Sequence, residues 1–166
     1  MQKWLVVLAA AVAVAVFAPM TVADQPNKVQ IVNWASSGTL LAGAGCSFDI
    51  GVQALVNGTY TQFVDKSGAT KKEQYHLVEQ DTFTANGKTL TGVPFTFNVT
   101  WLYDSAGNLT HVYADGVIEK VRLPDGSLFI SAGRVDFVAH GFPSFILTPD
   151  HGGTVNLDGF CAALEP

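Results

Sequence analysis

The stretch TLTGVPFTFNVTWLY, residues 89–103, decides the fold that this 166-residue chain is expected to adopt. Apolar side chains occupy every second position, at Val93, Phe95, Phe97, Val99, Trp101 and Tyr103. Thr96, Asn98 and Thr100 lie between them, which is the two-residue period of a β-strand with one buried face. We therefore expect a central strand here, bent near its start because proline at position 94 donates no ladder hydrogen bond.

Turn signals on both sides extend this strand into an antiparallel meander. Residues 104–108 and 124–126 separate strand-like runs, and each contains residues that tolerate positive φ. Turns at residues 57–58, 65–68 and 86–87 predict further strands over residues 48–56, 59–64, 72–85, 109–123, 127–140 and 144–147. The expected fold class is all-β. An antiparallel β-barrel of about eight strands is favoured by interposed glycines, and a two-sheet β-sandwich is the alternative.

The N-terminus has the pattern of a secretory signal peptide. Lys3 precedes an apolar run over residues 4–17, and small residues at 21–23 predict cleavage before Asp24. A membrane anchor is the alternative, but it needs about 20 apolar residues. The predicted organisation is a signal peptide at 1–23, an N-terminal strand and flexible connector at 24–45, and one β-barrel domain at 46–166. We therefore expect a secreted, extracellular protein without an integral membrane segment in its mature form.

The chain has two cysteines, Cys46 and Cys161, which lie near the two ends of the predicted domain. In an exported protein an even count of two predicts one disulfide bond, and only one pairing is possible. The alternative is lipid attachment at Cys46, but Gly43 stands where a lipidation site has a large aliphatic residue.

Charge and motif content argue against several function classes. The formal net charge is −5, or −6 without the leader, and no basic cluster exceeds Lys71 and Lys72, so nucleic acid is not an expected partner. Four histidines lack metal-site spacing, so we expect no metal. No nucleophile elbow or phosphate-binding glycine loop occurs, and we expect no cofactor.

The aromatic inner register is the candidate ligand-binding surface. It consists of Phe95, Phe97, Trp101, Tyr103, Phe129 and Phe137. A barrel interior lined in this way accepts a small lipophilic molecule, because such pockets are mostly apolar with a few polar groups. The alternative is that these side chains simply fill the core.

Polar residues in an apolar register are the candidate catalytic groups. Glu79 and Asp81 fall in such a register, and His111 and Tyr113 on a later strand are expected to converge with them. Paired carboxylates with raised pKa values beside a histidine suit acid or base catalysis. Alternatively, bulges turn both carboxylates to solvent and His111 lies on the surface; a further bulge is expected at residues 115–116.

Several short motifs resemble those of secreted bacterial proteins of unknown function. They are CSFD at residues 46–49, DTFTANGK at 81–88, LPDGS at 123–127, GRV at 133–135 and FCAAL at 160–164. That group carries one cysteine near each end of a small all-β domain. More distantly, the layout is similar to allene oxide cyclase-like and lipocalin-like barrels, whose interiors accept lipophilic molecules. The resemblance implies architecture and carries over no functional residue.

The leading functional hypothesis is an exported protein that binds a small lipophilic ligand or acts as a surface binding module, without catalysis. The alternative is a cofactor-free cyclase or isomerase that uses the carboxylates and the histidine. A third possibility is a structural or adhesive surface protein, which an exposed apolar patch or an unpaired sheet edge would indicate. The ligand and the oligomeric state do not follow from the sequence.

Overall fold

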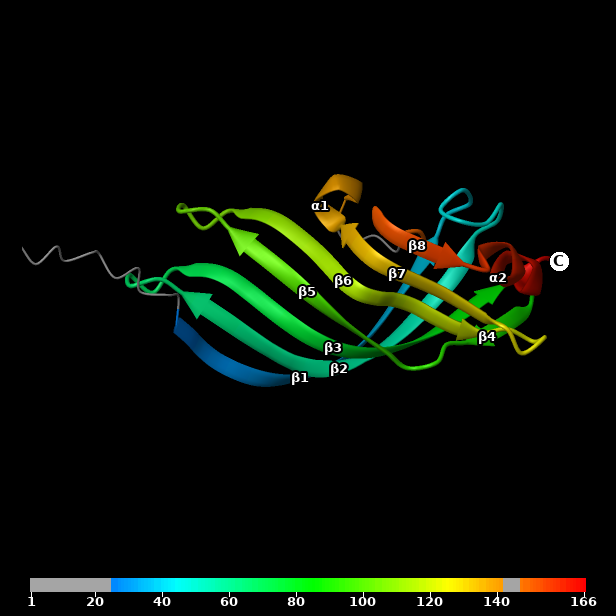
Figure 1. Ribbon diagram of the computed structural model, residues 1–166, viewed down its shortest axis with the longest axis horizontal. Helices are drawn as coiled ribbons and strands as arrows, with labels where there is room; N and C mark the ends of the chain where they lie inside the picture. Colours follow the sequence, from blue (N-terminus) through cyan, green and yellow to red (C-terminus); the bar gives the residue numbers. More distant parts are fainter. Residues whose placement is uncertain (1–24, 142–146) are drawn as a thin grey trace, which may run out of the picture.

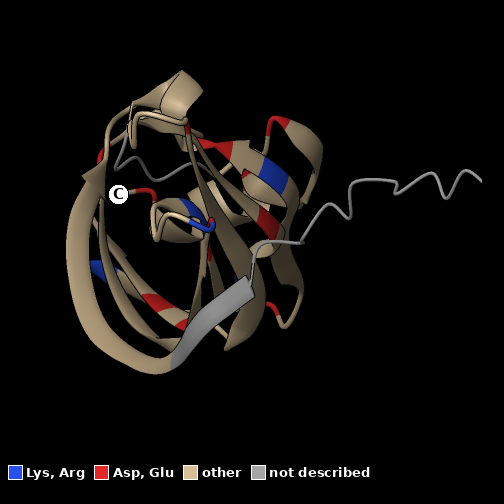
Figure 2. Cartoon of the chain, turned by 90° about the vertical axis from the view of Figure 1, so that its left-hand side faces the viewer, with Lys and Arg blue, Asp and Glu red and all other residues tan. Residues whose placement is uncertain are grey.

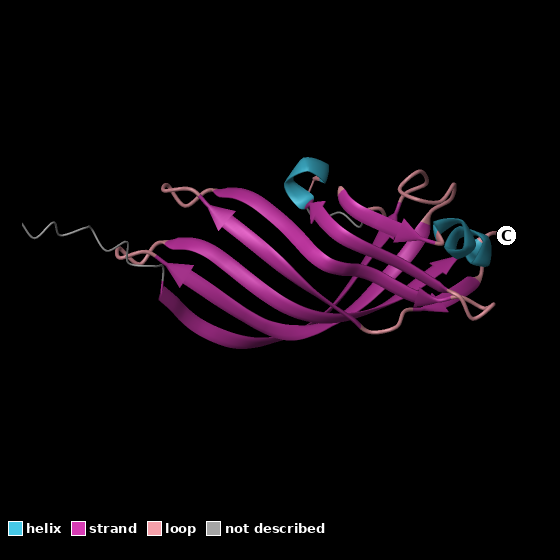
Figure 3. Cartoon of the chain, in the orientation of Figure 1, coloured by secondary structure: helices cyan, strands magenta, loops and turns pink. Residues whose placement is uncertain are grey.

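The computed structural model describes residues 25–141 and 147–166 of the chain. It is an all-β protein, as predicted, with two short helices (Figure 3). The strands are β1 Gln25–Leu40, β2 Ile50–Val64, β3 Thr70–Ala85, β4 Lys88–Thr91, β5 Phe95–Tyr103, β6 Leu109–Arg122, β7 Leu128–Asp136 and β8 His151–Val155. The helices are α1 Phe137–His140 and α2 Leu157–Leu164.

All eight strands belong to one antiparallel sheet. Its order is β1-β2-β3-β5-β6-β7-β8, with β4 paired to β3 (Figure 1). The sheet curls round on itself (Figure 2), but no pairing joins β1 to β8 within the described residues. The antiparallel all-β prediction is thus confirmed, whereas the sheet is not closed into the expected barrel. The alternative sandwich is not formed either, because one sheet contains every described strand.

The stretch at residues 89–103 forms two strands with a bend between them. β4 pairs with the end of β3, and β5 pairs with the earlier part of β3. At the bend, the Gly92 N–H donates to the Asp81 carbonyl and the Val93 N–H donates to the Lys120 carbonyl. A Cβ at Gly92 would lie 3.0 Å from the Asp81 carbonyl oxygen, so the crossing favours glycine. The predicted bend is therefore confirmed.

The predicted meander of β5, β6 and β7 is confirmed, as is the turn at Asn86 and Gly87, whose φ values are 50° and 75°. The turn predicted at Asn57 and Gly58 is wrong, since both residues lie within β2 and pair with β1 and β3. A Cβ at Gly58 would collide with the carbonyl of His76. This glycine thus permits a close strand approach rather than a turn.

The N-terminal segment is more ordered than the sequence suggests. β1 pairs with β2 along nearly its whole length, so it belongs to the same sheet rather than to a short strand and flexible connector. The loop that follows contains a hydrogen bond from the Gly43 N–H to the Cys46 carbonyl. The predicted leader at 1–23, and the strand predicted at 144–147 except for Leu147, lie outside the described residues.

Strand β7 ends earlier than predicted, because Asp136 begins helix α1. The Asp136 carboxylate accepts hydrogen bonds from the backbone N–H groups of Val138 and Ala139. A capping carboxylate of this kind satisfies amides that lack helical partners and so starts a helix. The strand predicted over residues 127–140 is therefore shortened to Leu128–Asp136.

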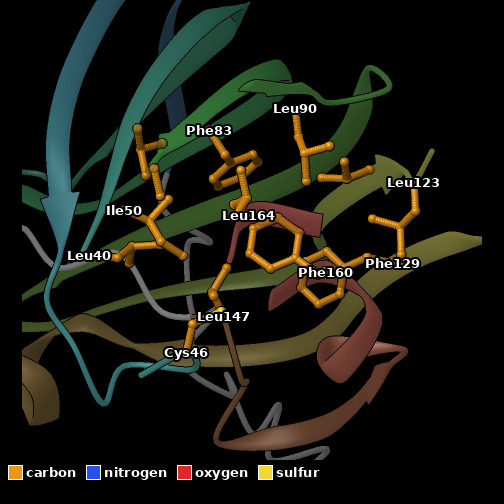
Figure 4. Packing of buried hydrophobic residues seen from close by; sticks show 13 residues of the cluster. Leu40, Cys46, Ile50, Phe83, Leu90, Leu123, Phe129, Leu147, Phe160 and Leu164 are labelled. Atoms are coloured by element: carbon orange, nitrogen blue, oxygen red, sulfur yellow. The ribbon is translucent and has the colours of Figure 1, made fainter. Parts of the chain in front are cut away.

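The main core lies between helix α2 and one end of the sheet (Figure 4). The Phe160 ring stacks on Phe129 at a centroid distance of 4.5 Å and meets the edge of Phe83 at 5.1 Å. Phe160 and Leu164 are fully buried, one helical turn apart. The C-terminal segment is thus helical, and its eight residues are too few for a clear helical pattern in the sequence.

The disulfide between Cys46 and Cys161 is confirmed and joins the loop before β2 to helix α2. The two Cα atoms are 5.5 Å apart, within the ordinary range for a disulfide. The alternative of lipid attachment at Cys46 is therefore wrong, because the sulfur atom is already bonded. The bridge fixes α2 against the sheet across a sequence separation of 115 residues.

Removing this bridge is expected to destabilise the fold substantially. A loop of about 100 residues gains roughly 4 to 5 kcal/mol from closure in the chain-entropy account. We predict that a Cys46→Ala and Cys161→Ala double variant loses about 3 to 5 kcal/mol of unfolding free energy in urea titrations. The reduced wild-type protein is the control and should match the variant. A loss below about 1 kcal/mol would contradict the structural role of the bridge.

Candidate functional site

One face of the curled sheet carries the core and the candidate site, and we call it the concave face. Successive side chains of a strand point to opposite faces, and cross-strand partners share a face. Every second residue of β2, β3, β5, β6 and β7, apart from the register shifts, therefore points to the concave face. Near α2 the face is tightly packed. Away from α2, a second and smaller cluster around Ala54, Val56 and Leu77 is bordered by aromatic residues that are only partly buried. The concave face therefore has a closed half and a more exposed half.

The exposed half is rich in aromatic side chains, and we call it the aromatic end. It comprises the partly exposed residues Tyr60, Tyr75, Phe97, Trp101 and Tyr103. The rings of Tyr60 and Tyr75 are 4.9 Å apart between centroids, and those of Tyr75 and Trp101 are 6.4 Å apart. Aromatic rings held at such distances form a stable, largely apolar surface.

Glu73 links two of these tyrosines. Its carboxylate accepts a hydrogen bond of 2.8 Å from the Tyr60 hydroxyl and one of 2.9 Å from the Tyr103 hydroxyl. Burial, together with these hydrogen bonds to a carboxylate, raises the pKa of both tyrosines above its usual value. The two phenols therefore remain protonated at neutral pH, and the carboxylate fixes the orientation of both rings.

Three carboxyl groups lie between the closed half and the aromatic end, and we call them the carboxyl cluster: Glu79, Asp81 and Glu119. The pairing of β2 with β3 is regular through Glu79 and Asp81, so both point inward rather than being turned out by a bulge. Asp81 is 1% exposed and Glu119 is 7% exposed, whereas Glu79 is half-buried. Carboxyl groups rarely occupy such positions without a cationic partner.

Burial raises the pKa of every carboxyl group in this cluster. Burial, followed by the charge of Asp81, raises the pKa of Glu79 to about 9. The same two causes raise the pKa of Glu119 well above its usual range. Burial also raises the pKa of Asp81, although hydrogen bonding to Glu119 and Glu79 opposes this effect. At neutral pH Glu79 therefore holds a proton that an isolated carboxylate would have lost.

Sequence reasoning missed Glu119 because it placed His111 and Tyr113, rather than Val112 and Ala114, on the inner face of β6 before the bulge. The register of β6 against β7 shifts between Val117 and Glu119, rather than at residues 115–116. The shift brings Glu119 to the concave face, on which Val112 and Ala114 also lie. The available signal was that the apolar residues of the inner face occupy even positions up to Ala114 and odd positions from Val121 onward.

The structure does not bring His111 and Tyr113 to the carboxyl cluster. Val112 and Ala114 are buried on the concave face, so the intervening His111 and Tyr113 project from the opposite, convex face. There they border an open groove of about 550 Å³. Its lining is Leu102, His111, Tyr113, Arg134, Asp136, Ala139, Asp150 and His151. The predicted convergence of the four candidate catalytic residues is therefore wrong.

Ion pairs occupy this convex groove. Arg134 bonds to Asp115 at 2.7 Å, and its guanidinium carbon lies 4.5 Å from the centre of the Tyr113 ring. His140 contacts the carboxylate of Asp150. The Asp136 N–H and then His140 hold the pKa of Asp150 below its usual value. These contacts fasten α1 and the chain before β8 to the sheet, which is a structural role.

The predicted ligand-lining residues separate into two groups. Phe95, Phe97, Trp101 and Tyr103 share the concave face of β5, and the rings of Phe95 and Phe97 are 5.7 Å apart. Phe129 is fully buried in the core against α2. Phe137 begins helix α1. The aromatic end gains Tyr60 and Tyr75 from β2 and β3, which the sequence prediction did not include.

Within residues 25–141 and 147–166, no three histidine, cysteine or acidic side chains are arranged to hold a metal ion. Neither described helix has the length and apolar character that a bilayer crossing needs. Comparisons with protein-family models, with curated proteins and with solved structures gave no match. Function is therefore inferred from the geometry of the concave face.

The carboxyl cluster is expected to make the protein less stable as the pH rises. Between about pH 4.5 and pH 9, folded Glu79 keeps a proton that the unfolded chain releases, so raising the pH favours unfolding. The free energy of unfolding should fall by up to about 1.4 kcal/mol per pH unit for each such carboxyl group. Thermal unfolding followed by circular dichroism from pH 5 to pH 9 measures this slope.

The variant Glu79→Gln should flatten the slope, because an amide stays neutral in both states. Glu165→Gln is the matched control, since Glu165 is exposed at the end of α2 and lies outside the cluster. It should keep the wild-type slope. An unchanged slope in Glu79→Gln would mean that this group ionises normally in the folded protein.

Proposed function

We propose that the protein is an exported binding module that takes a small lipophilic molecule on the aromatic end of its concave face. The observation that carries the proposal is the division of this face, which is packed by α2 at one end and leaves aromatic side chains partly exposed at the other. Binding sites for small molecules are mostly apolar and aromatic, with a few polar groups that orient the ligand. Glu73 and the carboxyl cluster are such groups.

Two features support export. Disulfide bonds persist in oxidising compartments, and the bridge between Cys46 and Cys161 is formed. The predicted leader at residues 1–23 is of the secretory type. Catalysis by an isomerase or cyclase has no comparable support, because His111 projects from the convex face, away from Glu79 and Asp81.

Two tyrosines on opposite faces provide a matched test. Tyr75 contacts Tyr60 and Trp101 at the aromatic end, whereas Tyr113 lies on the convex face. We predict that Tyr75→Ala weakens binding of the neutral lipophilic dye Nile red by about fivefold, since an aromatic contact contributes about 1 kcal/mol. Tyr113→Ala should bind as the wild type does. Dye fluorescence titrations measure both, and equal effects of the two variants would contradict the assignment of the site.

A second candidate function, association at a surface, is supported by strand β1. Its outer edge has no strand partner within the described residues, and it is 16 residues long. Ile31 on this strand is 89% exposed and Trp34 is 40% exposed. Long, apolar, unpaired edges are sites at which another strand adds to a sheet.

This candidate predicts self-association through β1. Ile31→Lys places a charge on the edge and should shift an oligomer to the monomer in size-exclusion chromatography with light scattering. Thr59→Lys is the control, because Thr59 is the exposed neighbour of Ile31 on β2 and does not lie on the edge. A wild-type protein that is monomeric at high concentration would argue against the edge as an interface.

A further inference from the structure

The carboxyl cluster lacks the partners that buried acids normally have. Both oxygens of Asp81 and one oxygen of Glu119 receive no hydrogen bond from a backbone or side-chain N–H or hydroxyl group among the described residues. The hydrogen bonds that remain for Asp81 are those with the carboxyl groups of Glu79 and Glu119. The ion pairs between described residues involve other acids. Buried polar atoms without partners are rare in folded proteins and require an explanation such as a bound ligand.

Ser131 gives a second, independent observation at the same place. Its side chain is fully buried, and its hydroxyl oxygen has no hydrogen-bond partner among the described residues. Ser131 on β7 is the direct cross-strand partner of Glu119 on β6, so both side chains occupy the same face of the sheet. The unsatisfied atoms are all oxygens, each with lone pairs free to accept a hydrogen bond, and the Ser131 hydroxyl also has one O–H to donate.

The cluster meets the proposed ligand surface at Glu79. Glu79 is its half-buried member, and its cross-strand partners on the concave face are Val56 and Phe95. The next residue on this face of β3, toward the aromatic end, is Leu77. A molecule lying on the aromatic end thus has apolar side chains along its body and the carboxyl of Glu79 at its inner end.

We propose that this site selects a ligand with an organic ammonium head and an apolar body. This inference rests on the proposed ligand-binding function. An ammonium group has up to three N–H donors and no acceptor, which complements carboxyl and hydroxyl oxygens that receive no hydrogen bond from an N–H group. Hydrogen bonds between an ammonium and a carboxylate are charge-assisted and strong in partly buried surroundings. A fatty acid is disfavoured, because its carboxylate adds a fourth acid to the cluster, and an alcohol satisfies only one acceptor.

Binding of an ammonium exchanges a proton for a cation at the cluster. The bound positive charge favours the ionised form of Glu79, so the carboxyl proton leaves to solvent as the amine binds. The apparent affinity for the amine should therefore increase as the pH rises from 6 to 8, over a range in which the ligand itself stays charged.

Three ligands with the same eight-carbon body test the inference: octylamine, 1-octanol and octanoate. Titrations of the intrinsic tryptophan fluorescence of the oxidised protein at pH 7 report binding near Trp101. We expect octylamine to bind about tenfold or more tighter than 1-octanol, and octanoate to bind weakest. Glu79→Gln should remove the preference, so that octylamine binds no tighter than 1-octanol. Glu165→Gln, the same substitution at an exposed position outside the cluster, should leave all three affinities unchanged.

The outcomes separate this inference from the proposed function. Equal affinity of wild-type protein for octylamine and 1-octanol overturns the inference and retains lipophilic binding. Absence of binding by all three ligands contradicts the proposed function as well. Undiminished octylamine binding by folded Glu79→Gln, checked by circular dichroism, also overturns the inference. If Glu79→Gln does not fold, the wild-type order of the three affinities still decides it.

Discussion

The packing of helix α2 against the concave face is the contact on which the rest of the structure depends. Phe160 inserts between Phe129 and Phe83, and so connects strands β3 and β7, which are not neighbours in the sheet. No pairing joins β1 to β8 within the described residues, so this contact stabilises the curl of the sheet, together with the backbone bridge between Gly92 and Val121. The bond between Cys46 and Cys161 holds the helix in this position.

The concave face changes character with distance from α2. Aliphatic and aromatic side chains fill the end next to the helix, the carboxyl cluster follows, and partly exposed aromatic rings lie beyond it. Burying acids next to a packed core costs free energy, and an apolar residue of similar volume would stabilise the fold more. Such a cost is commonly found at functional sites, which is why the cluster and not the convex groove is the centre of the functional argument.

Much of the architecture could be predicted from local sequence patterns, and the failures have physical causes. The alternation in β5 and the pair Cys46 and Cys161 are local or unique signals, and both predictions are confirmed. Gly58 was misread as a turn because a close approach between strands and a turn both require glycine. Glu119 was missed because His111 and Tyr113 were placed on the inner face of β6 in place of Val112 and Ala114, and α2 because eight residues hold only about two helical turns.

The unpaired seam between β1 and β8 gives the sheet a mechanical freedom that a closed barrel lacks. In a closed barrel, strand number and stagger fix the radius, so widening the interior requires hydrogen bonds to break. Here the circumference is interrupted within the described residues, and α2 anchors only one end. The aromatic end is therefore able to widen or narrow by flexing of the strands alone, which would let one scaffold accommodate molecules of different size.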